Sequence, residues 1–416
     1  MIEQLHKLYP ALYGKEYDEK EMDNRFQHLV QKHKEIFGED DPAIFSAAGR
    51  TEIGGNHTDH NLGKVIGGSV NLDTIGAVTK RSDNRVIIAS EGFPVVDVDI
   101  SDLSVKDGEK NGTDSLVRGI AAAYKDRGMK IGGWQANTTT KVLGGSGLSS
   151  SAAIEVLIAK IFDNLYNDDA LEPIEIAKMG KYAENKYFGK PSGLLDQACC
   201  AQGGIVGIDF KDNDNPVLTP VNISFEDYGY TMIITDTRGS HADLTGEYAA
   251  VPPEMREVAA YYGKKNLRDV DFQAFIRDMK DIREKLGNDR ALLRAYHFFT
   301  ENIRVDYMLQ TLKEGDIDGF LGFVNESGNS SFRFLQNVYP SSSPKNQGLA
   351  LAIALSEHIL QGDGAVRVHG GGFAGTIQAY VPQALVGKYI SGMESLFGSG
   401  CSMKIAIRQL PVTRLI

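Results

Sequence analysis

The sequence has few of the features that stabilise exported or membrane-embedded proteins. It contains three cysteines among 416 residues, and Cys199 and Cys200 are adjacent, so no disulfide between these two is expected. No disulfide framework is expected, and a reducing cytoplasm is the expected compartment. The first residues lack the basic cluster and apolar stretch of a signal peptide, and no apolar run approaches about 18 residues. We therefore expect neither export nor a membrane span.

Positive charge is also in short supply. The chain has 44 lysines and arginines against 55 aspartates and glutamates, a formal net charge of −11. Nucleic acid and anionic membranes would repel such a chain at long range, so neither is an expected partner. An anionic substrate would need a local positive site. The composition, 42% hydrophobic and 24% charged, is that of an ordinary globular protein with a sizeable core.

Strand-like and helix-like segments alternate along the chain. Short β-branched or alternating runs predict strands at 43–47, 85–89, 95–100, 230–234, 365–368, 376–381 and 403–407. Helical spacing predicts helices at 154–165, 173–189 and in several stretches between 253 and 361. We predict a mixed α/β architecture of two lobes, residues 1–215 and 216–416.

The Gly-Lys-Ser/Thr of a P-loop is absent, but three other glycine-rich segments are present, at 49–61, 144–152 and 369–375. The second leads through Ser149, Ser150 and Ser151 directly into the helix expected at 154–165. Unpaired backbone N–H groups at such a turn, together with the helix dipole, bind phosphate without a lysine. Serine hydroxyls are also ligands for Mg²⁺. A helix N-cap with a flexible connector would give the same pattern.

Two carboxylates and one arginine are candidates for chemistry. Glu184 falls on the packed face of its helix, where it needs either a basic partner or Mg²⁺. Asp196 lies among apolar residues near a helix start, which favours its ionised form; it can orient or deprotonate a hydroxyl, or simply cap the helix. Arg50 can stabilise a developing negative charge, or it can be an ordinary surface residue.

The first glycine-rich segment contains His57, Thr58, Asp59 and His60. Two histidines with no cysteine nearby form a weak metal pattern. Hydrogen bonding to sugar hydroxyls suits the segment better, because Asp59 can accept from two vicinal hydroxyls while Asn56 and His57 both donate and accept. A turn rich in side-chain to backbone bonds is the alternative.

The three glycine-rich segments, together with residues 193–197 between the second and third, resemble in this order the galactokinase family of the GHMP small-molecule kinases. The resemblance extends from about Gly49 to the last strand. It implies a ribosomal-S5-like N-terminal lobe and a ferredoxin-like C-terminal lobe. It also implies transfer of the γ-phosphoryl group of ATP, with Mg²⁺, to the anomeric hydroxyl of galactose.

The resemblance assigns roles to individual positions. It implies catalysis by Asp196 and Arg50, sugar binding, nucleotide binding and Mg²⁺ ligation. The sugar-binding positions are Asn56, His57, Asp59, Gly193 and Tyr248; the nucleotide-binding positions are Gly145, Ser146, Gly147, Ser149, Ser150 and Ser151; the Mg²⁺ ligands are Ser151 and Glu184.

Four positions depart from the family pattern. Galactokinases usually have Glu-His-Thr-Asp-Tyr where this chain has Asn56 to His60, so a carboxylate at the sugar 6-hydroxyl becomes an amide. Kinases for N-acetylgalactosamine or L-arabinose are therefore alternatives. His369 replaces a threonine and Thr113 replaces a tryptophan, so the adenine pocket can differ and the preference for ATP over GTP is left open.

A non-enzymatic sugar sensor on the same fold is a further alternative. The joint presence of Arg50, Ser151, Glu184 and Asp196 disfavours it, since sensing alone would not require a phosphoryl-transfer set. The expected partners are a small sugar and a nucleotide. A monomer is expected, although the sequence does not specify the oligomeric state.

Overall fold

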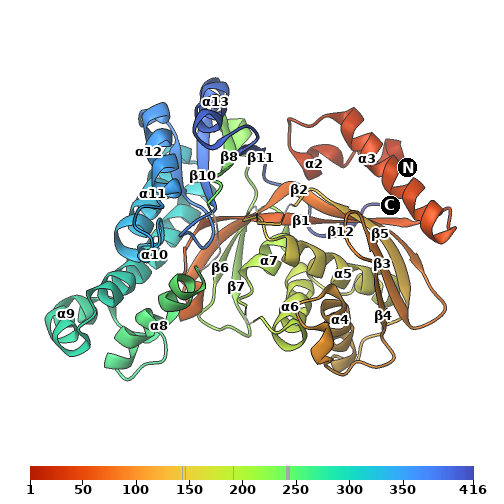
Figure 1. The fold of residues 1–416 in the computed structure, drawn as a ribbon, viewed down its shortest axis with the longest axis horizontal. Coiled ribbons are helices and arrows are strands. Elements are labelled where there is room, and N and C mark those ends of the chain that lie inside the picture. The colour runs from red at the N-terminus through yellow and green to blue at the C-terminus, as the bar shows by residue number, and fades with distance from the viewer. Residues whose placement is uncertain (143, 146, 191, 240–243) are drawn as a thin grey trace.

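The computed structural model describes residues 1–142, 144–145, 147–190, 192–239 and 244–416. Two sheets form its framework (Figure 1). The larger has the order β12-β1-β2-β5-β3-β4, with β6 also paired to β2 and β7 paired to β6, and the smaller has the order β11-β8-β10-β9. The strands of the larger sheet are β1 Ala43–Gly54, β2 Lys64–Lys80, β3 Arg85–Ser90, β4 Val96–Asp99, β5 Trp134–Thr140, β6 Ile205–Asp209, β7 Val217–Val221 and β12 Thr413–Arg414; those of the smaller are β8 Tyr230–Asp236, β9 Ala365–Val368, β10 Thr376–Pro382 and β11 Ser402–Ile405.

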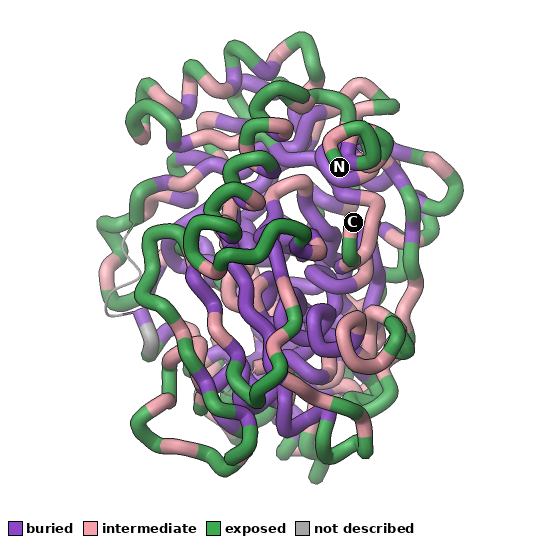
Figure 2. Tube along the Cα trace, turned by 90° about the vertical axis from the view of Figure 1, so that its right-hand side faces the viewer, coloured by how far each residue is buried: buried purple, intermediate pink, exposed green. Residues whose placement is uncertain are grey.

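Helices cover both faces of the larger sheet (Figure 1). On one face lie α1 Ile2–His6, α2 Tyr9–Tyr13 and α3 Glu19–Phe37, and on the other α4 Thr113–Asp126, α5 Ser150–Asn167, α6 Pro173–Ala183 and α7 Leu195–Gln202. Because both faces are covered, β1 is buried along almost its whole length. Figure 2 shows the buried residues concentrated in the middle of the molecule.

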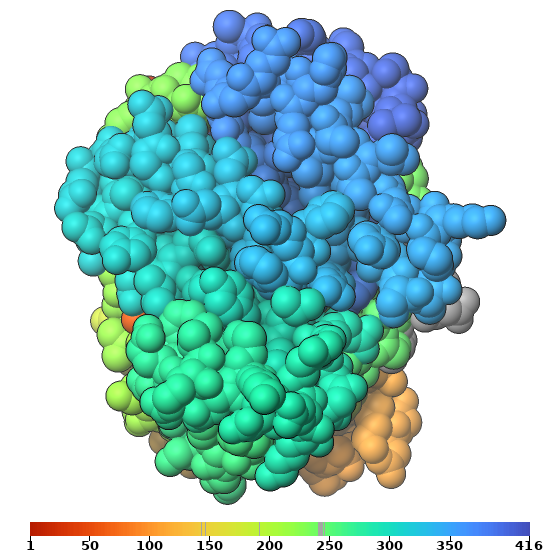
Figure 3. Space-filling view, turned by 90° about the vertical axis from the view of Figure 1, so that its left-hand side faces the viewer, coloured from red at the N-terminus to blue at the C-terminus, as the bar shows by residue number. Residues whose placement is uncertain are grey.

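The second lobe consists of the smaller sheet and two groups of helices. Helices α11 Ile317–Ser330, α12 Gly348–Leu360 and α13 Val386–Phe397 contact that sheet. Helix α10 Asp289–Glu314 packs against α11 and β2, and α8 Thr245–Tyr261 and α9 Phe272–Leu286 pack against α10. Together these helices form most of the face that Figure 3 shows. The predicted mixed α/β architecture is confirmed.

The length of β1 and the pairing of two later strands differ from what the sequence pattern indicates. The strand expected at 43–47 continues to Gly54 and carries polar Arg50, Thr51 and Glu52 in buried positions. Pairing in the larger sheet also crosses residue 215, because β7 pairs with β6, and β12 returns from the end of the chain to pair with β1. The division into residues 1–215 and 216–416 stays a prediction.

Asp73 on β2 connects the N-terminal helices to the larger sheet. Its side chain is fully buried and accepts hydrogen bonds from Ser46 at 2.6 Å and Tyr13 at 3.2 Å. Arg25 forms an ion pair with the same carboxylate, and Arg408 lies 3.6 Å away. Burial raises the pKa of this carboxyl, but the two arginines outweigh burial and bring the pKa below its ordinary value.

We predict that Asp73→Asn lowers the free energy of unfolding by about 3–5 kcal/mol at neutral pH, because Arg25 and Arg408 lose their anion. The folded pKa of Asp73 is depressed, so its stabilisation is present above the unfolded pKa of about 4 and is lost as the pH falls through the folded value. Urea unfolding of wild type and variant should therefore converge in acid. The exposed Asp40→Asn variant is the control, and equal stability of wild type and Asp73→Asn at neutral pH would contradict the prediction.

Candidate functional site

The candidate site lies where the second half of β1 meets the loop before α5, the loop before α7 and the loop between β9 and β10. Two adjoining cavities occupy this place. The first has a volume of about 230 Å³ and is lined by Glu52, Asn56, His57, Asp59 and Gly193, among others. The second has a volume of about 290 Å³, and its lining includes Arg50, Gly145, Gly147, Ser149, Ser150 and Ser151. The structure thus separates the expected sugar-binding and phosphate-binding residues into neighbouring cavities.

Asp196 lines both cavities, together with Lys190 and Gly371. The Nε–H of Arg50 donates to its Oδ1 atom at 2.8 Å, and the hydroxyl of Ser149 donates to its Oδ2 atom at 2.7 Å. Burial raises the pKa of Asp196, but Arg50 and Ser149 outweigh burial and hold it below its ordinary value. Asp196 is therefore an ionised acceptor at the junction of the cavities.

The loop before α5 approaches the third glycine-rich segment closely. Gly147 has a φ of +74°, and its carbonyl accepts a hydrogen bond from Arg50. A Cβ atom at Gly147 would lie 2.9 Å from the Thr376 hydroxyl and 3.0 Å from Nδ1 of His369, so a side chain would not fit there. Ser150 and Ser151 form the first turn of α5 and face the second cavity, where the helix N-terminus favours an anion. Ser146 lies outside the described residues.

Glu184 begins a π-helical turn, Glu184–Phe188, at the end of α6, and its side chain is buried. Its carboxylate accepts from Nζ of Lys190 at 2.8 Å, from Nε2 of Gln197 at 2.8 Å and from the hydroxyl of Ser192. Of the two interpretations of Glu184, the structure therefore contains the ion pair, which Glu184 forms with Lys190. The oxygen atoms of Glu184 and Ser151 still suit Mg²⁺, which would have to replace the Lys190 ammonium at the carboxylate.

His57 and Asp59 form one wall of the first cavity. The Nε2–H of His57 donates to the carbonyl of Gly371 at 2.9 Å, which leaves Nδ1 as an acceptor. Burial, followed by the effect of His60, lowers the pKa of His57 to about 4. A Cβ atom at Gly193 would lie 2.9 Å from Oδ2 of Asp59, so a side chain there would displace that carboxylate.

Tyr248 on α8 contacts the third glycine-rich segment. Its hydroxyl donates to the carbonyl of Gly372 at 2.7 Å, and its ring meets Phe373 edge to face. The ring also occupies the space beside Gly371. The structure therefore places Tyr248 where it holds the loop that lines both cavities.

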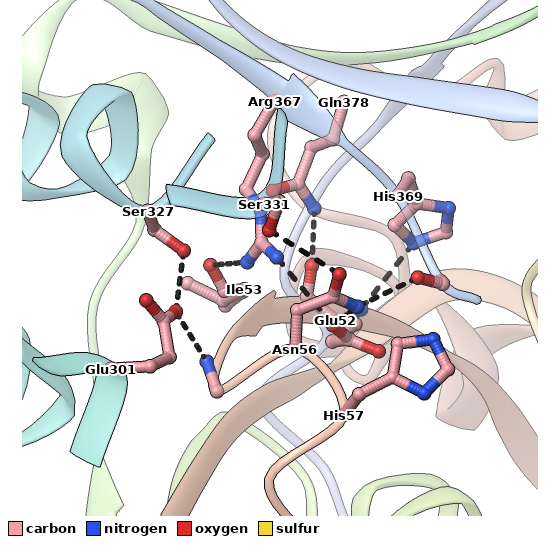
Figure 4. Close-up of polar contacts among 12 residues, drawn as sticks. Glu52, Ile53, Asn56, His57, Glu301, Ser327, Ser331, Arg367, His369 and Gln378 are labelled. Carbon is pink, nitrogen blue, oxygen red and sulfur yellow. Dashed lines mark hydrogen bonds and ion pairs between the residues drawn. The ribbon is translucent and has the colours of Figure 1, made fainter. Parts of the chain in front are cut away.

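The side-chain amide of Asn56 is occupied by contacts within the protein. Its Nδ2 atom donates to Oε1 of Glu52 at 2.7 Å and to the carbonyl of Gly370 at 2.8 Å. Its Oδ1 atom accepts from Nδ2 of Asn337 at 2.7 Å and from the hydroxyl of Ser331 at 3.3 Å. Figure 4 shows Glu52 and Asn56 side by side at the centre of this network. Asn56 thus joins the first and third glycine-rich segments.

His369 lies between β1 and the third glycine-rich segment. The backbone N–H of Glu52 donates to its Nε2 atom at 3.3 Å, and its Nδ1 atom lies 3.0 Å from the Thr376 hydroxyl. The histidine is therefore neutral, with its proton on Nδ1. Burial lowers its pKa well below the ordinary value, and Arg50 and Arg367 lower it further.

Sequence reasoning missed Lys190 and Glu52. Lys190 is a basic residue close to Gly189 and Gly193 in an acidic chain, and this local contrast is the signal that identifies it. Glu52 gave no signal of its own, because its place in the first cavity depends on the continuation of β1.

Residues 31–80 match the family model described as the galactokinase galactose-binding signature, and residues 115–204 match that of the GHMP kinases N terminal domain. The galactokinase of Actinobacillus pleuropneumoniae serotype 5b (strain L20) is 30% identical over 363 residues, which cover 86% of this chain and 90% of that protein. This chain belongs to the galactokinase family. The galactokinase of Streptomyces coelicolor is 28% identical over 373 residues, covering 89% of this chain and 92% of that protein.

Solved structures of the superfamily share the fold. The structure of Lactococcus lactis galactokinase complexed with galactose has a TM-score of 0.79 at 24% identity, covering 94% of this chain and all of that one. Methanococcus jannaschii mevalonate kinase has a TM-score of 0.63 at 13% identity, covering 88% of this chain and 98% of that one. The GHMP kinase fold expected from the sequence is confirmed. Within the described part of the chain, no helix is long and apolar enough to cross a membrane.

Histidines with lowered pKa values should make this galactokinase-family protein sensitive to mild acid. His57, His297 and His369 have lowered pKa values in the folded state, so the unfolded chain binds more protons below its pKa of about 6.5. Each histidine can remove up to about 1.4 kcal/mol of stability per pH unit below that point. We predict that the stability of His369→Gln depends less steeply on pH between about 6.5 and 5. Urea titrations measure the slope; exposed His28→Gln is the control, and an unchanged slope in His369→Gln would refute the prediction.

Proposed function

We propose that this protein transfers the γ-phosphoryl group of ATP to the anomeric hydroxyl of D-galactose, giving α-D-galactose 1-phosphate and ADP. As a member of the galactokinase family the protein is an ATP-dependent sugar kinase. The observation that carries the assignment of the site is the position of Asp196, which lines both the first and the second cavity. A sugar in the first cavity and phosphates in the second would meet at this carboxylate.

Asp196 is proposed to orient the attacking hydroxyl and to accept its proton. Its lowered pKa keeps it ionised at neutral pH, ready to accept a hydrogen bond. A loose phosphoryl-transfer transition state asks little of a base, so orientation is the larger part of this role. Arg50, which holds Asp196 and the Gly147 carbonyl, is proposed to stabilise the charge on the transferring group.

The second cavity is proposed to hold the nucleotide phosphates. Gly145, Gly147, Ser149, Ser150 and Ser151 surround it, and Ser146 is assigned to the same role from the sequence alone. Ser151 and Glu184 would hold Mg²⁺, which neutralises phosphate charge when bound. Lys190 adds positive charge at the junction of the cavities, and a metal held by Glu184 would take the place of the ion pair between Lys190 and that carboxylate. ATP is the proposed nucleotide, with GTP as the alternative.

The first cavity is proposed to hold the sugar. His57 offers its Nδ1 atom and Asp59 its carboxylate, while Gly193 leaves room beside Asp59. Tyr248 supports the loop that closes this cavity, and Asn56 fixes its wall through protein contacts. N-acetylgalactosamine and L-arabinose are the alternative substrates that the panel below separates from galactose.

A two-lobed monomer in the cytoplasm completes the proposal. The cysteines Cys199, Cys200 and Cys401 are buried and unpaired, which suits a reducing compartment.

We predict fast ADP release with Mg²⁺-ATP and galactose, and slower release with N-acetylgalactosamine, L-arabinose, glucose and mannose. Asp196→Asn should lose about 10²- to 10⁴-fold in kcat while it still binds galactose, because the amide keeps the shape but not the proton acceptor. A coupled ADP assay and calorimetric sugar titration measure the two quantities. Near-normal turnover of the variant would remove Asp196 from the mechanism. Sugar binding without turnover by the wild type would favour a sensor.

We predict that Ser151→Ala and Glu184→Gln each raise the Mg²⁺ concentration for half-maximal activity by about 10-fold or more, because each removes one oxygen ligand. Activity at saturating ATP, titrated with Mg²⁺, is the measurement, and Glu357→Gln on an exposed helical surface is the matched control. If Glu184→Gln lowered thermal stability but left the Mg²⁺ titration unchanged, Glu184 would be only the structural partner of Lys190.

A further inference from the structure

We infer that Glu52 supplies the carboxylate that accepts a hydrogen bond from a sugar hydroxyl away from the reacting carbon. The inference rests on the proposed function and refines its sugar specificity. Its starting point is the contrast between two neighbouring side chains, Asn56 and Glu52, which both line the first cavity.

Asn56 has no unused hydrogen-bonding position toward a sugar. A side-chain amide has two N–H hydrogens and a carbonyl oxygen with two lone pairs. In Asn56 the hydrogens go to Glu52 and Gly370, and the oxygen accepts from Asn337 and Ser331. The residue is 1% exposed. A sugar hydroxyl would have to displace one of these four partners to reach it.

Glu52 has the capacity that Asn56 lacks. Its Oε1 atom accepts from Asn56 at 2.7 Å and lies 3.5 Å from Nη2 of Arg367. Its Oε2 atom accepts no hydrogen bond from the described residues. Because Glu52 lines the first cavity, this oxygen is the acceptor that remains for a ligand there. Burial raises the pKa of Glu52 despite Arg367 and Arg50, as expected for a carboxylate that is short of hydrogen-bond donors.

Strand geometry places Glu52 on the same side of β1 as the reacting centre. Residues two apart on a strand point to the same face and are separated by roughly 7 Å. Arg50, Thr51 and Glu52 pair in unbroken register with β2, so Arg50 and Glu52 share a face. Arg50 holds Asp196, and Asp196 and Glu52 both line the first cavity, whose volume is about 230 Å³.

The backbone around Glu52 is fixed by the second lobe. Its N–H donates to His369, and its carbonyl accepts from Nε2 of Gln378 at 3.1 Å. Fully buried Arg367 donates to the carbonyl of the next residue, Ile53 (Figure 4). Asn56 and Arg367 then hold one carboxylate oxygen and orient the other. These contacts make Glu52 a preorganised acceptor of a hydroxyl hydrogen.

The test is Glu52→Gln, which keeps the size and an acceptor for Asn56 but removes the charge. We expect the KM for galactose to rise about 10- to 100-fold, since a hydrogen bond to a charged group is lost. The KM for ATP should stay the same and kcat should change less than the KM for galactose. Glu357→Gln is the matched control. Glu52→Asp, which keeps the charge on a shorter side chain, should give a smaller rise in KM.

Deoxygalactoses identify the hydroxyl. Wild type and Glu52→Gln are compared with galactose lacking the 2-, 3-, 4- or 6-hydroxyl. The wild type should bind one of these deoxygalactoses more weakly than it binds galactose, whereas Glu52→Gln should bind that sugar as tightly as it binds galactose. The reason is that removing the sugar hydroxyl and removing the charge of Glu52 delete the same hydrogen bond. The inference would be overturned if Glu52→Gln bound all four deoxygalactoses more weakly than galactose, as the wild type does. An unchanged KM for galactose in Glu52→Gln would also overturn it.

The outcomes separate this inference from the proposed function. If the wild type turns over galactose and Glu52→Gln behaves like wild type, the function stands and the role of Glu52 fails. If the wild type turns over no sugar, the proposed function fails first. If Glu52→Gln does not fold, as judged by circular dichroism, the comparison passes to Glu52→Asp, in which an unchanged KM for galactose overturns the inference.

Discussion

The ion pair between Arg50 and Asp196 is the interaction on which the arrangement of the site depends. It joins β1 to the start of α7, and Arg50 extends the connection to the loop before α5 through the Gly147 carbonyl. Ser149 binds the other oxygen of Asp196, so the same loop is held twice. Without this pair the two cavities would share no fixed boundary. The position of Asp196 is thus fixed by contacts among three segments that are far apart in the sequence.

A second constraint is the overall charge of the chain. A protein with a net charge of −11 that handles polyphosphates must concentrate positive potential locally. Arg50 and the N-terminus of α5 provide it around the second cavity, and Lys190 adds to it at the junction of the two cavities. The carboxylates Glu52 and Asp59 lie around the first cavity instead, where hydroxyl groups need acceptors. The division of charge between the cavities follows the division of chemistry between the two ligands.

The sequence predicted the elements that depend on local pattern. The helix after the serine run and the strands β1, β3, β4 and β8 to β11 follow from spacing and composition, whereas β2, β6, β7 and β12 were not predicted. The structure brings Asp196, Arg50 and the serines together as expected. The sequence could not predict the hydrogen-bond partners of Asn56, because Asn337 and Ser331 reach Asn56 from the second lobe. For the same reason Glu52 was missed: tertiary contacts with His369 and Gln378 accompany the continuation of β1 beyond residue 47.

The return of residues 408–414 to the larger sheet affects how the protein is made. Strand β12 pairs with β1, and the fully buried Arg408 binds the backbone and hydroxyl of Ser46. On the ribosome the first lobe emerges early, but its sheet lacks an edge strand until residues near 414 leave the exit tunnel. Folding of the first lobe therefore cannot be completed before residues near 414 are available. The nascent chain must keep that open edge of β1 from pairing with other chains until β12 arrives.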